Sequence, residues 1–294
     1  VAFLDGGNSN YGTAIVGTVS GNTITYGSEY TFTMQNYNDV SVVSLDANRF
    51  VIGYRDRQNN RYGTAKIGDV SGSVITFGSA YVFNSGMTDY VKASKLDSDH
   101  FVVGYRDISN SNYSTTVIGT LSGNTISFGT EYVYSELNLY GSWSISGLGA
   151  NRFEISFRDQ VNGVGTGTSI IGTVLGSDIF YGDKYVYYSA FYYQISTARI
   201  NTNRFVVTYL TDSGAECIIG DIDNTNQIIW DGSSSSDWST AANWSEDVVP
   251  TSNANIYIAD VVNDPVVPVN VEADCKTLTI ETGGSLTILS DVKG

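Results

Sequence analysis

An arginine followed directly by an aspartate occurs three times in this sequence, at steps of 51 and 52 residues. A guanidinium beside a carboxylate can bind polar ligand groups, so the pairs could line equivalent polar pockets for a glycan. The same pair can instead fasten neighbouring strands and the loop that follows, which is the interpretation we favour. The candidate ligand-binding residues are Arg55, Asp56, Arg106, Asp107, Arg158 and Asp159.

Other catalytic and metal sites find little support in the residue types. The histidine is His100 and the cysteines are Cys217 and Cys275, so a zinc site or a Ser-His-Asp triad is not expected. Loops rich in Asp and Asn offer oxygen ligands, but they lack the carboxylate spacing of a calcium loop, and Asx turns explain them. No cofactor is predicted, and neither is a structural Ca²⁺. Paired carboxylates for polysaccharide hydrolysis stay open, although we find no acidic residue that departs from the repeat to mark such a site.

The three pairs belong to a longer repeat. The segment Phe50–Asp56 is repeated as Phe101–Asp107, and with more substitutions as Phe153–Asp159 and Phe205–Leu210. A fixed period of this length indicates one supersecondary unit per copy. In the second copy, alternating apolar residues and a tight hairpin at 71–73 predict four strands. These strands are expected at 40–45, 50–56, 62–70 and 74–83.

Four short antiparallel strands per copy are typical of a β-propeller blade. An immunoglobulin sandwich needs about seven strands over roughly 100 residues, without an internal repeat of half that length. We therefore predict an all-β protein with a β-propeller of about five repeats over 1–230, the first incomplete. A small all-β module, a sandwich or solenoid-like, follows over 231–294. Val1 enters the repeat inside a strand, and the strand expected at 285–288 has no later partner. We therefore expect the protein to continue beyond both ends of this chain.

The charge of the chain restricts its partners. The 294 residues carry a formal net charge of -15, which disfavours nucleic acid and anionic membrane surfaces. There is no apolar run of membrane-spanning length, roughly 18 residues, so no membrane insertion of this segment is expected. The remaining partner classes are polysaccharides and other proteins.

The repeat stops at a segment rich in tryptophan. Trp230, Trp238 and Trp244 fall within 15 residues, and we expect them to close the end of a small core rather than to stack on sugars. The segment contains four short motifs, Trp230-Asp231-Gly232, Asp237-Trp238, Asn243-Trp244 and Val249-Pro250-Thr251. This run resembles a module that precedes β-solenoid stretches in very large secreted bacterial adhesins, notably those exported by the type IX route in gliding bacteria. The Tyr-Arg-Asp repeats resemble propeller repeats of the same proteins.

The resemblance implies export, an extracellular or cell-surface address, and adhesion or display, and it supplies no catalytic residues. The leading prediction is therefore a non-catalytic structural or adhesive segment of a large bacterial surface protein, not an enzyme. Its partners would be surface polysaccharide or other surface proteins. The alternative is a carbohydrate-binding lectin-type propeller with one polar pocket per blade. A polysaccharide-acting enzyme comes third.

Overall fold

The computed structural model describes residues 1–34, 40–136, 142–149, 151–161, 164–189, 194–222, 228–245 and 247–289. Over these residues the regular elements are β-strands, apart from one 3₁₀ turn at Ala241–Asn243, which confirms the all-β prediction. No helix in the described part of the chain has the length and apolar character needed to cross a membrane. The chain divides into two compact units, residues 1–179 with 184–220, and 180–183 with 221–294. The predicted boundary near residue 230 stays a prediction.

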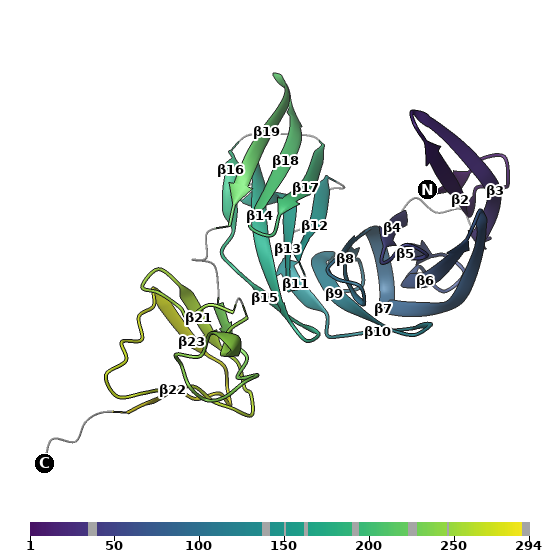
Figure 1. Ribbon diagram of the computed structural model, residues 1–294. Helices are drawn as coiled ribbons and strands as arrows, with labels where there is room; N and C mark the ends of the chain where they lie inside the picture. Colours follow the sequence, from purple (N-terminus) through teal and green to yellow (C-terminus); the bar gives the residue numbers. More distant parts are fainter. Residues whose placement is uncertain are drawn as a thin grey trace, which may run out of the picture. The chain divides into compact units, whose positions relative to one another are not determined.

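The first unit consists of antiparallel strands, one set for each sequence repeat (Figure 1). We call these sets sheets 1 to 5, although one long strand joins sheets 2 and 3 into one eight-stranded sheet. Sheet 1 contains β1 (Ala2–Asp5), β2 (Tyr11–Ser20) and β3 (Thr23–Thr33). Sheet 2 contains β4 (Val40–Ser44), β5 (Arg49–Asp56), β6 (Tyr62–Ser71) and the first part of β7 (Val74–Lys95). Sheet 3 contains the second part of β7, β8 (His100–Asp107), β9 (Tyr113–Ser122), β10 (Thr125–Phe128) and β11 (Tyr132–Ser135).

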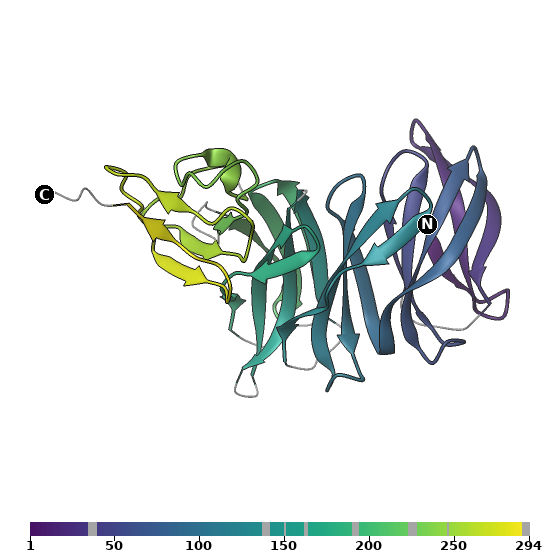
Figure 2. The ribbon, with the colours of Figure 1, turned by 90° about the horizontal axis from the view of Figure 1, so that it is seen from below.

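Sheets 4 and 5 complete the first unit. Sheet 4 contains β12 (Trp143–Gly149), β13 (Arg152–Val161), β14 (Val164–Leu175), β15 (Asp178–Tyr181) and β16 (Tyr185–Tyr188). Sheet 5 contains β17 (Ile195–Asn201), β18 (Arg204–Thr211) and β19 (Gly214–Asp221). In both views the strands of one sheet run side by side (Figure 2).

Strand β7 differs from the sequence prediction, which ended a strand at residue 83. The strand continues to Lys95 and passes from one sheet to the next. Met87 still pairs with Tyr62 of β6, whereas Thr88 already pairs with Asp107 of β8. Tyr90 adopts a left-handed conformation with φ 54° at the irregularity that follows, and the backbone stays extended on both sides of it.

A phenylalanine ring covers a glycine in four of the sheets. Phe50 on β5 pairs with Gly68 on β6, and a Cβ on Gly68 would lie 2.2 Å from the ring carbon Cζ of Phe50. Real Cβ atoms do not approach other atoms so closely, so glycine is required wherever the ring takes this position. The other pairs are Phe101 with Gly119, Phe153 with Gly172, and Phe205 with Gly220.

Aromatic pairs connect each sheet to the next. An aromatic residue near the end of one repeat contacts an aromatic residue on the second strand of the following repeat, with centroids at 5.2–5.5 Å, the range that favours edge-to-face packing. The pairs are Phe32–Tyr54, Phe83–Tyr105, Tyr134–Phe157 and Tyr187–Tyr209.

Serine side chains add hydrogen bonds at three of the same junctions. Each hydroxyl oxygen accepts from a backbone N–H of the next repeat, at 2.8–3.0 Å. The donors and acceptors are Ala93 to Ser41, Gly147 to Ser94, and Thr197 to Ser144. The first strands of successive repeats therefore lie against one another.

The second unit stacks short parallel strands over a tryptophan core. One ladder joins β20 (Ile228–Trp230), β21 (Asn255–Ile258) and β23 (Thr277–Ile280). A second joins β22 (Val266–Val267) to β24 (Thr287–Ile288). Trp244 packs edge-on against the other two core tryptophans, at 4.9 Å from Trp230 and 4.7 Å from Trp238. The tryptophans thus form a core, as predicted.

Replacing a covered glycine should destabilise the protein. In Gly119→Ala the new methyl group would meet the Phe101 ring at 2.3 Å, so we expect a loss of about 1–3 kcal/mol in the free energy of unfolding, measured by denaturant titration. Gly78→Ala is the matched control, because its Cβ would lie 3.8 Å from the Ile67 carbonyl oxygen. Equal losses in both variants would contradict the role given to the ring.

Candidate functional site

The aspartates of the first two Arg-Asp pairs close their own loops. Asp56, at the end of β5, accepts the backbone N–H of Gln58 at 3.0 Å on Oδ1. Asp107, at the end of β8, accepts those of Ser109 at 3.0 Å and Asn110 at 3.1 Å. These are the Asx turns that the sequence predicted.

The arginines of these two pairs share a third residue, Asp89 on β7. Arg55 and Arg106 each donate to one of its carboxylate oxygens, Arg106 Nη2 at 2.7 Å from Oδ2. The Arg106 guanidinium also lies 4.5 Å from the centroid of the Tyr90 ring, at cation–π distance. Arg55 is 7% exposed. The cluster therefore joins β5, β7 and β8 at the junction of sheets 2 and 3, and ligand binding there stays a prediction.

The third pair has different partners. Asp159, which is 2% exposed, forms an ion pair with Lys184 Nζ at 2.8 Å. The Arg158 side chain packs over Gly165, where a Cβ would come within 2.1 Å of its Nε. The three Arg-Asp pairs thus occupy equivalent places in the sequence without forming equivalent pockets.

Asp56 also borders a hollow between sheets 1 and 2, here called the Asp56 hollow, with a volume of about 430 Å³. Its polar lining includes Gln58 and Lys66, and Lys66 Nζ donates to the Phe32 carbonyl oxygen at 2.8 Å. The ring of Tyr54 lies deeper, and burial raises the pKa of its phenol, which stays protonated at neutral pH. The remaining lining residues are Thr31, Phe32, Thr33, Met34 and Ala80.

The Asp56 hollow combines what a sugar-binding site needs. A carboxylate, an amide and an ammonium group can bind sugar hydroxyls, while the exposed Met34 side chain can cover the apolar face of a sugar ring. Sequence reasoning selected Asp56 alone among these residues. Lys66 could have been found by aligning the repeats, because its counterparts in the next two repeats are the aliphatic Val117 and Ile170.

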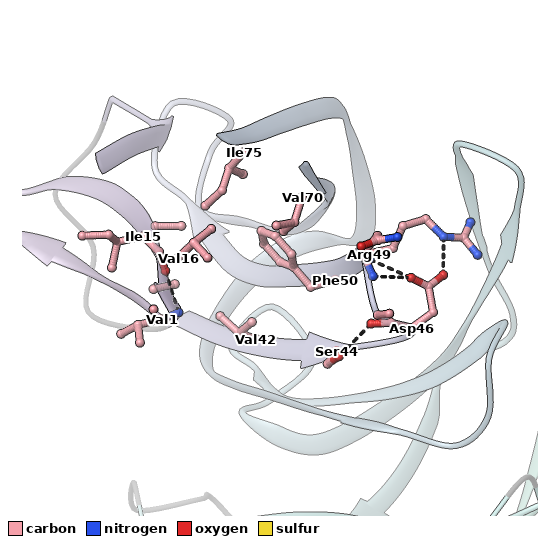
Figure 3. A pocket seen from close by; sticks show the side chains of 15 residues that line it. Val1, Ile15, Val16, Val42, Ser44, Asp46, Arg49, Phe50, Val70 and Ile75 are labelled. Carbon is pink, nitrogen blue, oxygen red and sulfur yellow. Dashed lines mark hydrogen bonds and ion pairs between the residues drawn. The ribbon is translucent and has the colours of Figure 1, made fainter. Parts of the chain in front are cut away.

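A second hollow, of about 280 Å³, has mainly apolar walls (Figure 3). Val42 and Phe50 line it from sheet 2, and Ile15 from sheet 1. The ion pair between Asp46 and Arg49, 2.7 Å long, lies to one side and lowers the pKa of the Asp46 carboxyl. This hollow suits an apolar group better than a sugar, and it contains none of the predicted site residues.

One buried acid was overlooked in the sequence. Glu154 on β13 is 0% exposed, and burial raises its pKa to about 7. Our expectation that no acidic residue departs from the repeat is therefore wrong. The same position holds Val51, Val102 and Val206 in the other copies, so an alignment of the repeats would have found it. Glu154 lines neither hollow.

A metal site finds no support in the described part of the chain, where no three His, Cys, Asp or Glu residues are grouped to hold an ion. The Asx turns already use a carboxylate oxygen of Asp56 and one of Asp107 for backbone N–H groups.

Comparison with known proteins gives one family match and several structural likenesses. Residues 229–293 match a family model described as "Domain of unknown function (DUF8693)". No curated protein matches the chain.

The structural likenesses include sialidases. A variant of the NanB sialidase from Streptococcus pneumoniae is similar with a TM-score of 0.53 and 12% identity, covering 72% of this chain and 36% of that one. NanB in complex with an ethanesulfonate compound gives 0.49 and 13%, with the same coverage. The Hadza microbial sialidase Hz136 gives 0.45 and 11%, covering 75% and 46%.

These likenesses correct the prediction of a non-catalytic structural or adhesive segment that is not an enzyme. The NanB variant, which is similar at a TM-score of 0.53, is a sialidase and thus an enzyme. At 12% identity the likeness to the NanB variant shows a common fold, and this chain spans 36% of that protein. The activity and substrate of the whole protein are accordingly matters for proposal.

Removing the charge shared by the two arginines should weaken the junction of sheets 2 and 3. In Asp89→Asn two largely buried guanidinium groups lose their common carboxylate, so we expect a loss of about 3 kcal/mol in the free energy of unfolding, measured by denaturant titration. Asp212→Asn, at an exposed position in the loop after β18, is the control and should change little. A loss no larger than that of the control would exclude the fastening role.

Proposed function

We propose that residues 1–230 form consecutive blades of a β-propeller in a carbohydrate-acting enzyme, and that the Asp56 hollow binds the sugar. The observation that carries the proposal is the lining of this hollow, in which charged and amide groups surround buried aromatic rings. The likeness to sialidases supports the carbohydrate class through the shared fold.

The propeller is supported by the way the sheets repeat. Each sequence copy folds into an antiparallel set of strands, and β7 joins the sets of the second and third copies into one eight-stranded sheet. Successive sets meet through aromatic pairs and through the serine bonds of their first strands. Blades of a propeller pack face to face with their first strands gathered together. We propose five blades in this chain, of which the first has three described strands.

A lectin with one pocket per blade has less support. Such a protein would need equivalent polar sites, whereas Arg55 and Arg106 share one carboxylate and Asp159 binds Lys184 instead. The Asp56 hollow depends on Lys66, which the other repeats lack. One special hollow agrees better with an enzyme that positions a single sugar.

An extracellular or cell-surface address belongs to the same proposal. It rests on the resemblance of residues 230–251 to modules of large secreted bacterial proteins, and the residues matched by the family model begin at 229. A surface polysaccharide would then be the substrate.

Two single variants test the sugar site. The 294-residue chain should bind one class of glycan on an array, and Gln58→Ala and Lys66→Met should each weaken its affinity by roughly tenfold, as the loss of one hydrogen bond to the ligand predicts. Affinities would be measured by calorimetry with the best glycan. Release of free sugar from that glycan would separate an enzyme from a lectin.

The control variant is Asn110→Ala, which alters the matching loop of sheet 3, where the Asn110 side chain is exposed. It should leave the affinity unchanged. Absence of glycan binding, or equal weakening by Asn110→Ala, would refute the assignment of the Asp56 hollow.

A further inference from the structure

The junction of sheets 4 and 5 is built from hydroxyl groups around one buried carboxyl. Glu154 and Ser156 on β13 are 0% exposed, and Ser169 on β14 is 6% exposed. From sheet 5, the backbone N–H of Thr197 donates to Ser144 Oγ at 3.0 Å. The positions of Glu154 and Ser156 hold Val51 and Gly53 in sheet 2, and Val102 and Gly104 in sheet 3.

One oxygen of the Glu154 carboxyl is hydrogen-bonded, and the other is buried without a partner in the described part of the chain. Ser156 Oγ donates to Glu154 Oε1 and lies 2.7 Å from Ser169 Oγ, whereas no hydrogen bond reaches Oε2 from the described residues. Thr197 Oγ1 donates to the Val206 carbonyl oxygen at 3.2 Å. Burial raises the pKa of the Glu154 carboxyl by more than the hydrogen bonds of Ser156, Thr197 and Ser169, which favour the carboxylate, lower it.

Charged groups around Glu154 are few. The neighbouring strands β12 and β14 contain no ionisable side chain, and β17 contains Arg199, which is exposed. On β13 itself, Arg152 lies on the same face, and its Nη2 donates to Asn203 Oδ1 at 2.9 Å. Arg158 lies on that face too, over Gly165. An ionised Glu154 would therefore rely on serine and threonine hydroxyls at a site without solvent exposure, which is costly.

We propose that Glu154 makes the junction of sheets 4 and 5 a pH-sensitive joint, closed while the carboxyl holds its proton and opened when the proton is lost. The geometry supports this because β17 approaches the carboxyl directly and carries Thr197 against it. When the joint opens, water reaches the carboxylate and removes the cost of keeping it buried. The joint is separate from the Asp56 hollow, so this proposal does not depend on the proposed sugar site.

The direction of the pH effect follows from the raised pKa of Glu154. Burial raises the pKa of Glu154 from 4.5 to about 7, so the closed state binds more protons than the open state between these values. The closed state is most stable relative to the open state below pH 4.5, and this stability is lost as the pH rises from 4.5 through 7. Between pH 6 and pH 8 the ratio of open to closed joint should rise roughly tenfold.

Hydrogen exchange measures the opening directly. Peptides that cover β17 and β18 should lose roughly tenfold in protection between pH 6 and pH 8, after correction for the intrinsic exchange rate. Peptides from β8 and β9 should keep their protection. No loss at β17, or an equal loss at β8 and β9, would overturn the proposal.

Variants test whether the pH-dependent loss of protection comes from the Glu154 carboxyl. Glu154→Gln retains a donor and an acceptor without ionising, so its β17 protection should be the same at both pH values. Glu154→Val restores the residue of the other repeats and provides the same test if the glutamine variant does not fold. Glu29→Gln, at an exposed position on β3, should behave as the wild type. A tenfold loss that persists without the Glu154 carboxyl would also overturn the proposal.

Discussion

A phenylalanine ring lying over a glycine is the contact on which the first unit depends. The ring occupies the space of a missing side chain on the adjacent strand, and a Cβ there would come within about 2.3 Å of it. Further rings then pack around this one. Phe77 contacts Phe50 of its own sheet at 6.1 Å and Phe32 of the preceding sheet at 5.8 Å. The phenylalanine ring that covers the glycine thus also takes part in the packing of one sheet on the next. The same contact occurs in several sheets because the sequence repeats.

The aromatic contacts recur from junction to junction, whereas the polar residues buried at each junction differ. Sheets 1 and 2 leave a polar hollow that contains Lys66. Sheets 2 and 3 bury two arginines around Asp89. Sheets 4 and 5 enclose Glu154 among serine and threonine hydroxyls. Because the aromatic contacts hold all these junctions together, polar groups can be introduced at one of them without the loss of the fold.

The sequence predicted the repeating part of this arrangement well. Alternating apolar residues and the Ser-Gly hairpins determine strands and turns locally, so the antiparallel sheets followed from the pattern of each copy. The junctions could not be predicted in this way. Asp89 lies outside the Arg-Asp motif and reaches both arginines only because β7 continues from sheet 2 into sheet 3. Likewise the Asp56 hollow joins β3 to residues of β5, β6 and β7 that are distant in the sequence.

Departures from a repeat carry more information about function than the residues that recur. A recurring residue such as Arg55 or Arg106 must satisfy a requirement common to the copies, which is usually packing or fastening. Lys66 and Glu154 instead place an ionisable group where the other copies have aliphatic side chains. Lys66 lowers that cost by donating to the Phe32 carbonyl oxygen beside an open hollow, whereas Glu154 lowers it by holding its proton. An ionisable group that packing does not require, and that the protein accommodates at such a cost, is best explained by a role in binding or in response to pH.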